Sequence, residues 1–141
     1  MKGPLMNKLK NWHFAILILL FAALACTTGY STSHTVTGNQ GQVVLKTKSA
    51  DGSNQTGIEI DEDYEWITIP MTITITVDAG SYQATFVDHE ENNVTLKALP
   101  DNPASIRTEM VTDGFGKIML QSEANGAEGV IITIDYIVPV Y

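Results

Sequence analysis

The fold is decided by residues 71–87, which read MTITITVDAGSYQATFV. Apolar side chains alternate with threonines as far as Val77, and a second alternation begins at Tyr82. A period of two places each apolar set on one face of a β-strand. The residues from Asp78 to Ser81 have the composition of a tight turn. This stretch therefore predicts two antiparallel strands joined as a hairpin.

Similar alternation recurs along the chain, with clusters of Gly, Asn, Asp and Pro between the apolar segments and no helical periodicity. The further expected strands lie around Val43–Leu45 and at Ile58–Ile60, Glu65–Ile69, Val94–Leu99, Ser105–Val111, Lys117–Glu123 and Val130–Val138. Short strands at spacings of about ten residues are typical of sandwiches. The sequence predicts an all-β domain over residues 36–141, a single immunoglobulin-like β-sandwich of about eight short antiparallel strands.

The N-terminal segment has the layout of a secretory signal peptide. Three lysines precede an apolar run from Phe14 to Ala25, which ends in small residues. A permanent transmembrane helix needs about 20 apolar residues, and this run is shorter. Residues 1–25 are therefore predicted to direct export and to be removed.

Cys26 is the only cysteine of the chain, and it directly follows Ala23-Leu24-Ala25. These residues resemble the lipobox of bacterial lipoproteins, in which the cysteine sulfur carries a diacylglycerol. The resemblance implies a lipid anchor at Cys26 and a place at the outer membrane or cell surface. Ordinary signal peptidase cleavage, giving a periplasmic or secreted protein, is the alternative. Residues 26–35 are expected to form a flexible tether or, alternatively, to hold part of a first strand around Tyr30.

The chain is acidic, with a formal net charge of −8. The part after Ala25 keeps all 16 acidic residues but only five basic ones, so its charge is −11. Such a surface disfavours nucleic acid, which requires basic patches. It favours solubility, divalent cations or basic partners. With one cysteine there is no intrachain disulfide, so packing must stabilise the domain.

Two acidic segments are rich in oxygen ligands, residues 61–65 (DEDYE) and residues 88–93 (DHEENN). Calcium takes six to eight oxygen ligands, and loops between strands often supply them. A calcium site would use Asp88, Glu90, Glu91 and Asn93. The alternative is that these loops are only solvated.

Three aromatic residues, Tyr64, Trp66 and Tyr82, are candidates for a carbohydrate platform, with burial in the core as the alternative. No G-x-S-x-G motif is present, and a triad around His89 would have to be assembled in space. The expectation is therefore a non-catalytic binding or structural protein of the cell envelope, with an unidentified protein or glycan partner. The alternatives are a secreted module that binds its ligand through calcium or a glycan, and then a small hydrolase.

Overall fold

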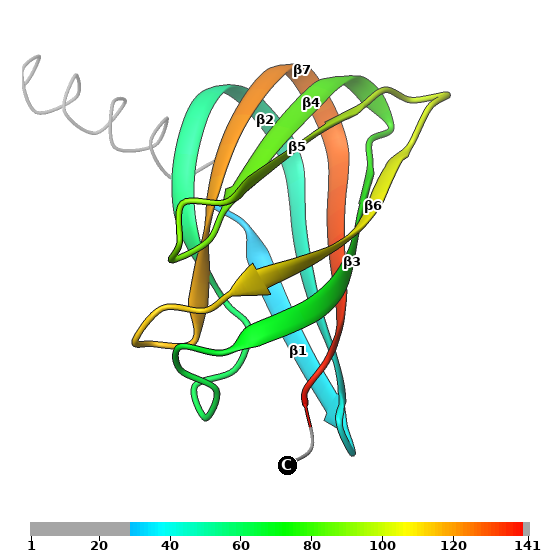
Figure 1. Ribbon diagram of the computed structural model, residues 1–141. Helices are drawn as coiled ribbons and strands as arrows, with labels where there is room; N and C mark the ends of the chain where they lie inside the picture. Colours follow the sequence, from blue (N-terminus) through cyan, green and yellow to red (C-terminus); the bar gives the residue numbers. More distant parts are fainter. Residues whose placement is uncertain (1–28, 140–141) are drawn as a thin grey trace, which may run out of the picture.

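The computed structural model describes residues 29–139, which form seven antiparallel β-strands (Figure 1). Their bounds are β1 Ser31–Thr37, β2 Gln40–Glu59, β3 Thr68–Thr76, β4 Ala79–Val87, β5 Asn93–Ala98, β6 Ala104–Val111 and β7 Lys117–Ile137. Within residues 29–139 there is no helix long and apolar enough to cross a membrane. The all-β prediction is confirmed for this part of the chain. The predicted signal segment, residues 1–25, and Cys26 lie outside the described residues.

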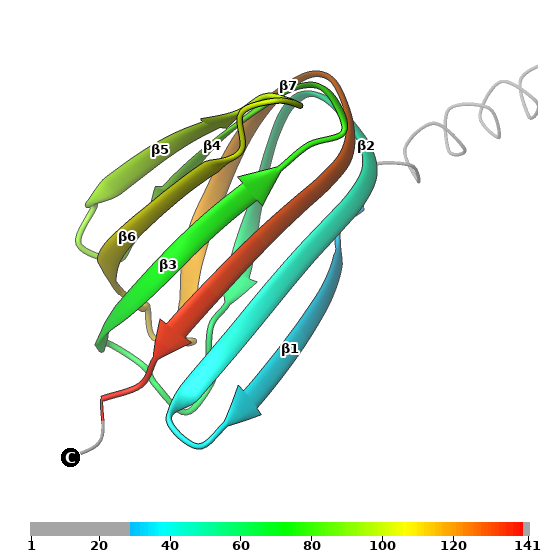
Figure 2. The same cartoon turned by 90° about the vertical axis from the view of Figure 1, so that its right-hand side faces the viewer.

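The strands form two layers that share β2 and β7. The first sheet has the order β1–β2–β7–β3–β6 and uses the early part of β2 and the late part of β7. The second sheet uses the other parts of these two strands and adds β4 and β5. The two layers pack face to face (Figure 2). The predicted β-sandwich is confirmed.

The core lies between the sheets because the predicted alternation continues along every central strand. Buried residues occupy every second position of β3 from Ile69 to Ile75 and of β4 from Tyr82 to Phe86. Leu120, Ile132 and their neighbours on β7 face them. Burial of such apolar side chains contributes about 1.5–3 kcal/mol each, which is how the domain is stable without a disulfide.

The prediction of about eight short strands was wrong in one respect. β2 and β7 have 20 and 21 residues, and each contains two segments that the sequence suggested were separate strands. Both strands bend where the chain passes from one sheet to the other. In an immunoglobulin sandwich each strand belongs to one sheet, so this topology differs from the predicted immunoglobulin-like one.

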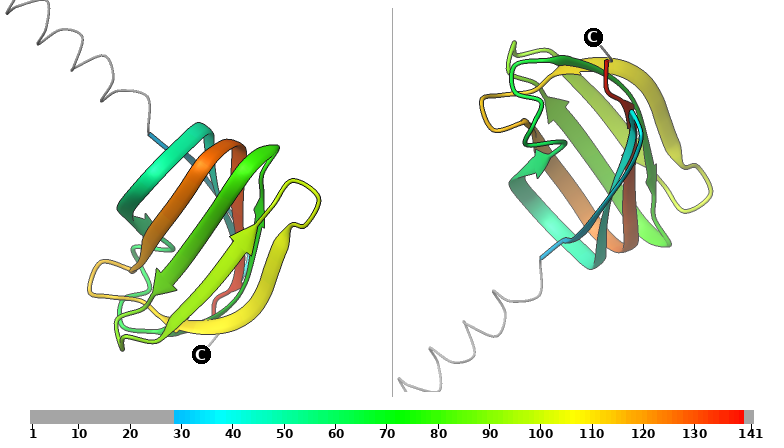
Figure 3. Two further views of the ribbon diagram at one scale, coloured as in Figure 1. Left: turned by 90° about the horizontal axis from the view of Figure 1, so that it is seen from above. Right: turned by 90° about the horizontal axis from the view of Figure 1, so that it is seen from below.

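The predicted hairpin at residues 71–87 was also wrong. β3 and β4 do not pair with each other; both pair with β7, from Met71↔Tyr136 through Ala79↔Glu128 and onward. Asp78 donates its backbone N–H to the carbonyl of Glu128, 2.8 Å away, so the turn residues bind β7. Figure 3 shows β2, β7 and β4 side by side at this corner.

The corner requires glycine where the strands approach closely. Gly80 has φ +73°, and a Cβ there would lie 2.2 Å from the carbonyl oxygen of Gly126 on β7. Any larger residue would meet both the steric cost of positive φ and a backbone clash. The Asp78–Ser81 segment is thus a bend between sheets that resembles a hairpin turn in composition.

The boundary of the domain lies earlier than predicted. Residues 31–35 belong to β1, which pairs with β2 from Ser31↔Lys46 to Thr37↔Gln40. The tether prediction is corrected for these residues, and the alternative of a first strand is the one observed. All seven residues of β1 are exposed, so backbone pairing rather than side-chain burial holds this edge strand in place.

Candidate functional site

Three loops meet at one end of the sandwich, and we call them together the loop end. They are residues 60–67 between β2 and β3, residues 88–92 between β4 and β5, and residues 112–116 between β6 and β7 (Figure 1). Backbone hydrogen bonds join the first and third of these loops, from Ile60 N to Gly116 O at 2.9 Å and from Thr112 N to Ile67 O at 3.0 Å. In the second loop, His89 donates its N–H to the carbonyl of Val111, at the end of β6, at 3.0 Å. The loop end is therefore a connected surface.

Polar side chains of the loop between β6 and β7 hold these loops in one conformation. Thr112 is fully buried, donates its hydroxyl to the carbonyl of Tyr64 at 2.6 Å and accepts the N–H of Ile67 at 3.1 Å. Asp113 accepts the N–H groups of Phe115 at 2.8 Å and of Lys117 at 3.0 Å. A loop fixed in this way can present side chains without a further ordering cost on binding.

Trp66 is the most unusual residue of the loop end. Its backbone has φ +57°, and its side chain is 58% exposed. The indole packs against the ring of His89 in a T-shaped arrangement, with centroids 4.3 Å apart and an interplanar angle of 74°. On another side it lies against Gly114, where a Cβ would come within 2.6 Å of the ring. The indole is thus oriented by two neighbours while much of it faces solvent.

Phe115 adds a second exposed aromatic ring, at 74% exposure, directly after Gly114. Beside it is an open hollow of about 370 Å³. The residues that line this hollow are Glu59, Glu62, Asp63, Glu65, Gly114, Phe115 and Lys117. The loop end therefore combines exposed aromatic faces with carboxylates.

Asp88, the first residue of the proposed calcium site, has another role. Its carboxylate is 6% exposed and accepts the N–H groups of Glu90, Asn92 and Val111 at 2.9–3.0 Å, together with the side-chain amide of Asn92. Burial alone would raise the pKa of this carboxyl, but these hydrogen bonds outweigh it and lower the pKa. Asp88 thus fixes the loop between β4 and β5.

The calcium prediction gains no support from the described residues. Within residues 29–139, no group of three His, Asp or Glu side chains is placed to hold a metal ion. Asp88 is engaged with its own loop, while Glu90, Glu91 and Asn93 are exposed. The site at Asp88, Glu90, Glu91 and Asn93 stays a prediction from sequence.

The three aromatic candidates divide between surface and core. Tyr82 is fully buried; its hydroxyl lies 2.6 Å from that of Tyr30, and burial raises its pKa. Tyr64 is half-buried and packs on the core. Trp66 alone is exposed. Phe115 was not among the residues predicted for the carbohydrate platform. Its position between two glycines, in Gly114-Phe115-Gly116, indicates an aromatic residue in a loop and could have identified it.

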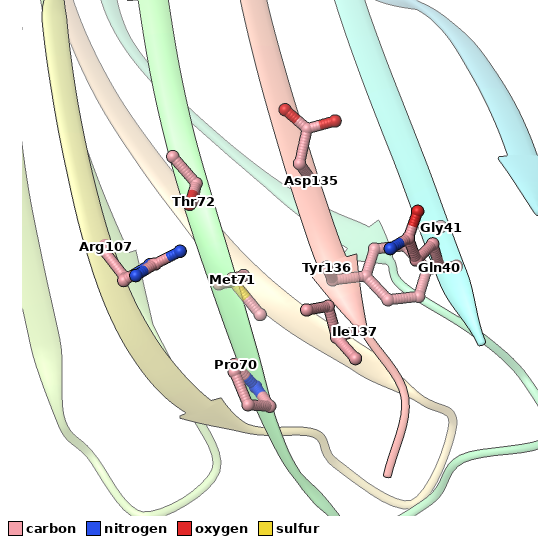
Figure 4. A pocket seen from close by; sticks show the side chains of 9 residues that line it. All are labelled: Gln40, Gly41, Pro70, Met71, Thr72, Arg107, Asp135, Tyr136 and Ile137. Carbon is pink, nitrogen blue, oxygen red and sulfur yellow. The ribbon is translucent and has the colours of Figure 1, made fainter. Parts of the chain in front are cut away.

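A second hollow, of about 470 Å³, lies on the outer face of the first sheet (Figure 4). Thr72 is at its centre, with Arg107 on β6 on one side and Asp135 on β7 on the other, all at one register position. Gln42 donates its side-chain amide to Asp135 at 2.7 Å. Among residues 29–139, the only aromatic residue that lines this hollow is Tyr136, which is buried at 2% exposure.

No protein-family model matches this chain, and no curated protein matches it in sequence. Among solved structures, a carbohydrate-binding module (CBM6cm-2) of Cellvibrio mixtus lichenase 5A in complex with cellotriose is 13% identical, with 81% of this chain and 89% of that chain covered and a TM-score of 0.34. The CBM22-1 xylan-binding domain of Paenibacillus barcinonensis Xyn10C is 9% identical, with coverages of 80% and 85% and a TM-score of 0.40. At these values the likeness carries no inference about function, which has to come from the site.

Proposed function

We propose that this chain is a non-catalytic carbohydrate-binding module and that the loop end is its binding surface. The observation that carries the proposal is Trp66, an exposed indole on a left-handed backbone. The left-handed conformation costs a residue with a side chain about 1–2 kcal/mol. Because much of the ring is exposed, its burial contributes little free energy to offset this cost. A strained backbone that carries an exposed aromatic ring points to a role in ligand binding and not in stability.

The chemistry of the surface suits a sugar ring. The face of an indole is electron-rich, and the C–H groups on one side of a pyranose pack against such a face. Carboxylates accept hydrogen bonds from sugar hydroxyls, and Glu62 and Glu65 in the neighbouring hollow are exposed. Aromatic contact with a few polar groups is the usual composition of a small-molecule site.

The proposal assigns binding and no bond cleavage. His89, the candidate base, packs on Trp66. Asp88, the adjacent carboxylate, accepts backbone N–H groups of its own loop. Both side chains therefore support the geometry of the binding surface.

We also propose that the module is exported and held at the cell envelope by a lipid on Cys26. The support is the run of apolar residues ending in Ala23-Leu24-Ala25-Cys26. Two or more acyl chains give stable membrane anchoring where one is marginal. Palmitate labelling of the wild type, absent from Cys26→Ser, is the expected result. An intact mass that starts at unmodified Cys26 would contradict the anchor and favour free secretion.

The binding proposal is tested by calorimetry against soluble oligosaccharides of glucose, xylose and N-acetylglucosamine. Trp66→Ala should weaken binding by about thirtyfold, because loss of a stacked aromatic face costs roughly 2 kcal/mol. Thr72→Ala on the first sheet is the matched control and should leave the affinity unchanged. Circular dichroism checks that both variants fold. Binding that survives Trp66→Ala, or that is lost with Thr72→Ala, would overturn the assignment to the loop end.

A further inference from the structure

We infer that the loop end selects glycans with positive charge, polymers of protonated amino sugars, over neutral glycans and against glycans with carboxylate or sulfate groups. This inference rests on the proposed function and names its substrate class. It comes from the charges around the exposed aromatic rings.

The hollow beside Phe115 has four carboxylates and one ammonium group. Glu59, Glu62, Asp63 and Glu65 are exposed, and Lys117 is half-buried. Within residues 29–139, no hydrogen bond or ion pair engages the side-chain oxygens of these four residues. Lys117 is therefore no direct partner for them, and the hollow has a formal charge of −3.

Three other carboxylates of the loop end accept hydrogen bonds from backbone N–H groups. Asp61 accepts the N–H of Asp63 at 3.0 Å, Asp113 accepts two N–H groups of its loop, and Asp88 holds the loop between β4 and β5. These three aspartates stabilise loop conformations. The four carboxylates of the hollow stabilise no loop in this way, so their negative potential is available to a ligand.

The aromatic rings, like the carboxylates, favour a positively charged ligand. A cation over the face of an indole or phenyl ring is attracted by the ring quadrupole, most strongly for tryptophan. Such faces are supplied by Trp66, whose ring lies against Gly114, and by Phe115, which directly follows Gly114 in the chain. A protonated amino sugar offers a C–H face for the ring and an ammonium group for the carboxylates. A uronate or a sulfated sugar would place its anion against a charge of the same sign, which costs affinity.

An amino glycan fits this surface better than a lysine-rich peptide. The amine of an amino sugar is attached directly to a rigid ring that has a C–H face, so stacking and charge contact occur within one residue. A lysine ammonium lies at the end of a flexible four-carbon stem and offers no face to stack. The arrangement of rings beside carboxylates therefore points to the sugar.

The test compares two ligands with the same sugar backbone at pH 5.5, the hexamer of glucosamine, whose amines are protonated, and the hexamer of N-acetylglucosamine, whose nitrogens are acetylated and neutral. At low salt the glucosamine hexamer should bind about tenfold more tightly, and added salt should reduce the difference, since exposed charges are screened. The double variant Glu62→Gln/Glu65→Gln keeps an acceptor oxygen at each position and removes the charge, so it should weaken binding of the glucosamine hexamer about threefold more than binding of the neutral hexamer. Trp66→Ala should weaken both.

Each other outcome has a distinct meaning. Equal or tighter binding of the neutral hexamer, with its loss in Trp66→Ala, would overturn the charge selection and leave the proposed function standing. Binding of neither hexamer, nor of glucose or xylose oligomers, would overturn both. Hexalysine that binds as tightly as the glucosamine hexamer, with no effect of Trp66→Ala, would overturn the glycan assignment in favour of a basic peptide.

Discussion

The loop end and the outer face of the first sheet offer different surfaces to a ligand. On the sheet face, strand pairing fixes each side chain, and neighbours satisfy one another: Gln42 binds Asp135, and Thr74 lies 3.1 Å from Ser105. At the loop end, the loops use buried Thr112 and Asp88 to fix the backbone and leave aromatic rings and carboxylates outward. On the paired sheet face, polar side chains hydrogen-bond one another. At the loop end, exposed aromatic rings and carboxylates remain free to contact a ligand.

The largest expected effect is on the bracing itself. Asp88→Ala removes a buried acceptor of four hydrogen bonds and should lower the free energy of unfolding by about 3 kcal/mol. Asp135→Ala, on the exposed sheet face, should lower it by about 0.5 kcal/mol or less. Urea unfolding measures both. Equal losses would show that the loop end is no more dependent on its polar contacts than the sheet face.

A smaller effect is expected from the support beneath Trp66. Gly114→Ala places a methyl group 2.6 Å from the indole ring, so the ring must move. We expect glycan affinity to fall about fivefold, with a loss of stability of roughly 1 kcal/mol. Gly57→Ala is the control, because its Cβ would meet only the side chain of Lys117 at 3.7 Å. An unchanged affinity for Gly114→Ala would mean that the ring orientation does not matter.

Acid should weaken the loop end gradually. The pKa of Asp88 is lowered in the folded protein, so the unfolded chain takes up the proton more readily. Its stabilising contribution is therefore present above the usual aspartate value of 3.8 and is lost as the pH falls through the folded pKa. The stability difference between wild type and Asp88→Asn, from urea midpoints, should shrink below about pH 4. A constant difference would contradict this role.

The smallest effect is expected on the sheet face. Arg107 is exposed, and within residues 29–139 it forms no ion pair with Asp135. Arg107→Ala should change glycan affinity by less than about twofold and stability by less than about 0.5 kcal/mol. A larger loss of glycan affinity in calorimetry would contradict the assignment of binding to the loop end and assign it to the hollow around Thr72.

The sequence predicts which residues face the core and misses which strands are neighbours. Alternation from Met71 to Val77 and from Tyr82 to Phe86 is confirmed position by position. A period of two is the same for a hairpin and for a strand that crosses a corner, so the pairing of β3 and β4 with β7 could not be read from it. Gly80 was recognised as a turn residue, but its close neighbour Gly126 lies far along the chain.

The candidate site was predicted in part. Trp66 was named, but within an expected strand at Glu65–Ile69, where β3 in fact begins only at Thr68. Its left-handed backbone is accompanied by a hydrogen bond from its N–H to the carbonyl of Asp113, 3.3 Å away, a contact distant in sequence that no local pattern predicts. Asp88 was named for calcium because acidic clusters do not show whether their oxygens face solvent or backbone N–H groups.

The central place of β7 has a consequence for how the domain forms. This last strand pairs with β2, β3 and β4, and Gln40 meets Ile137 across nearly the whole length of the domain. Strands far apart in sequence must pair before either sheet has its middle strand. Domains whose contacts have such large sequence separations fold slowly. Neither layer can be completed until the residues of β7 have been synthesised, so the domain acquires its structure only as a whole.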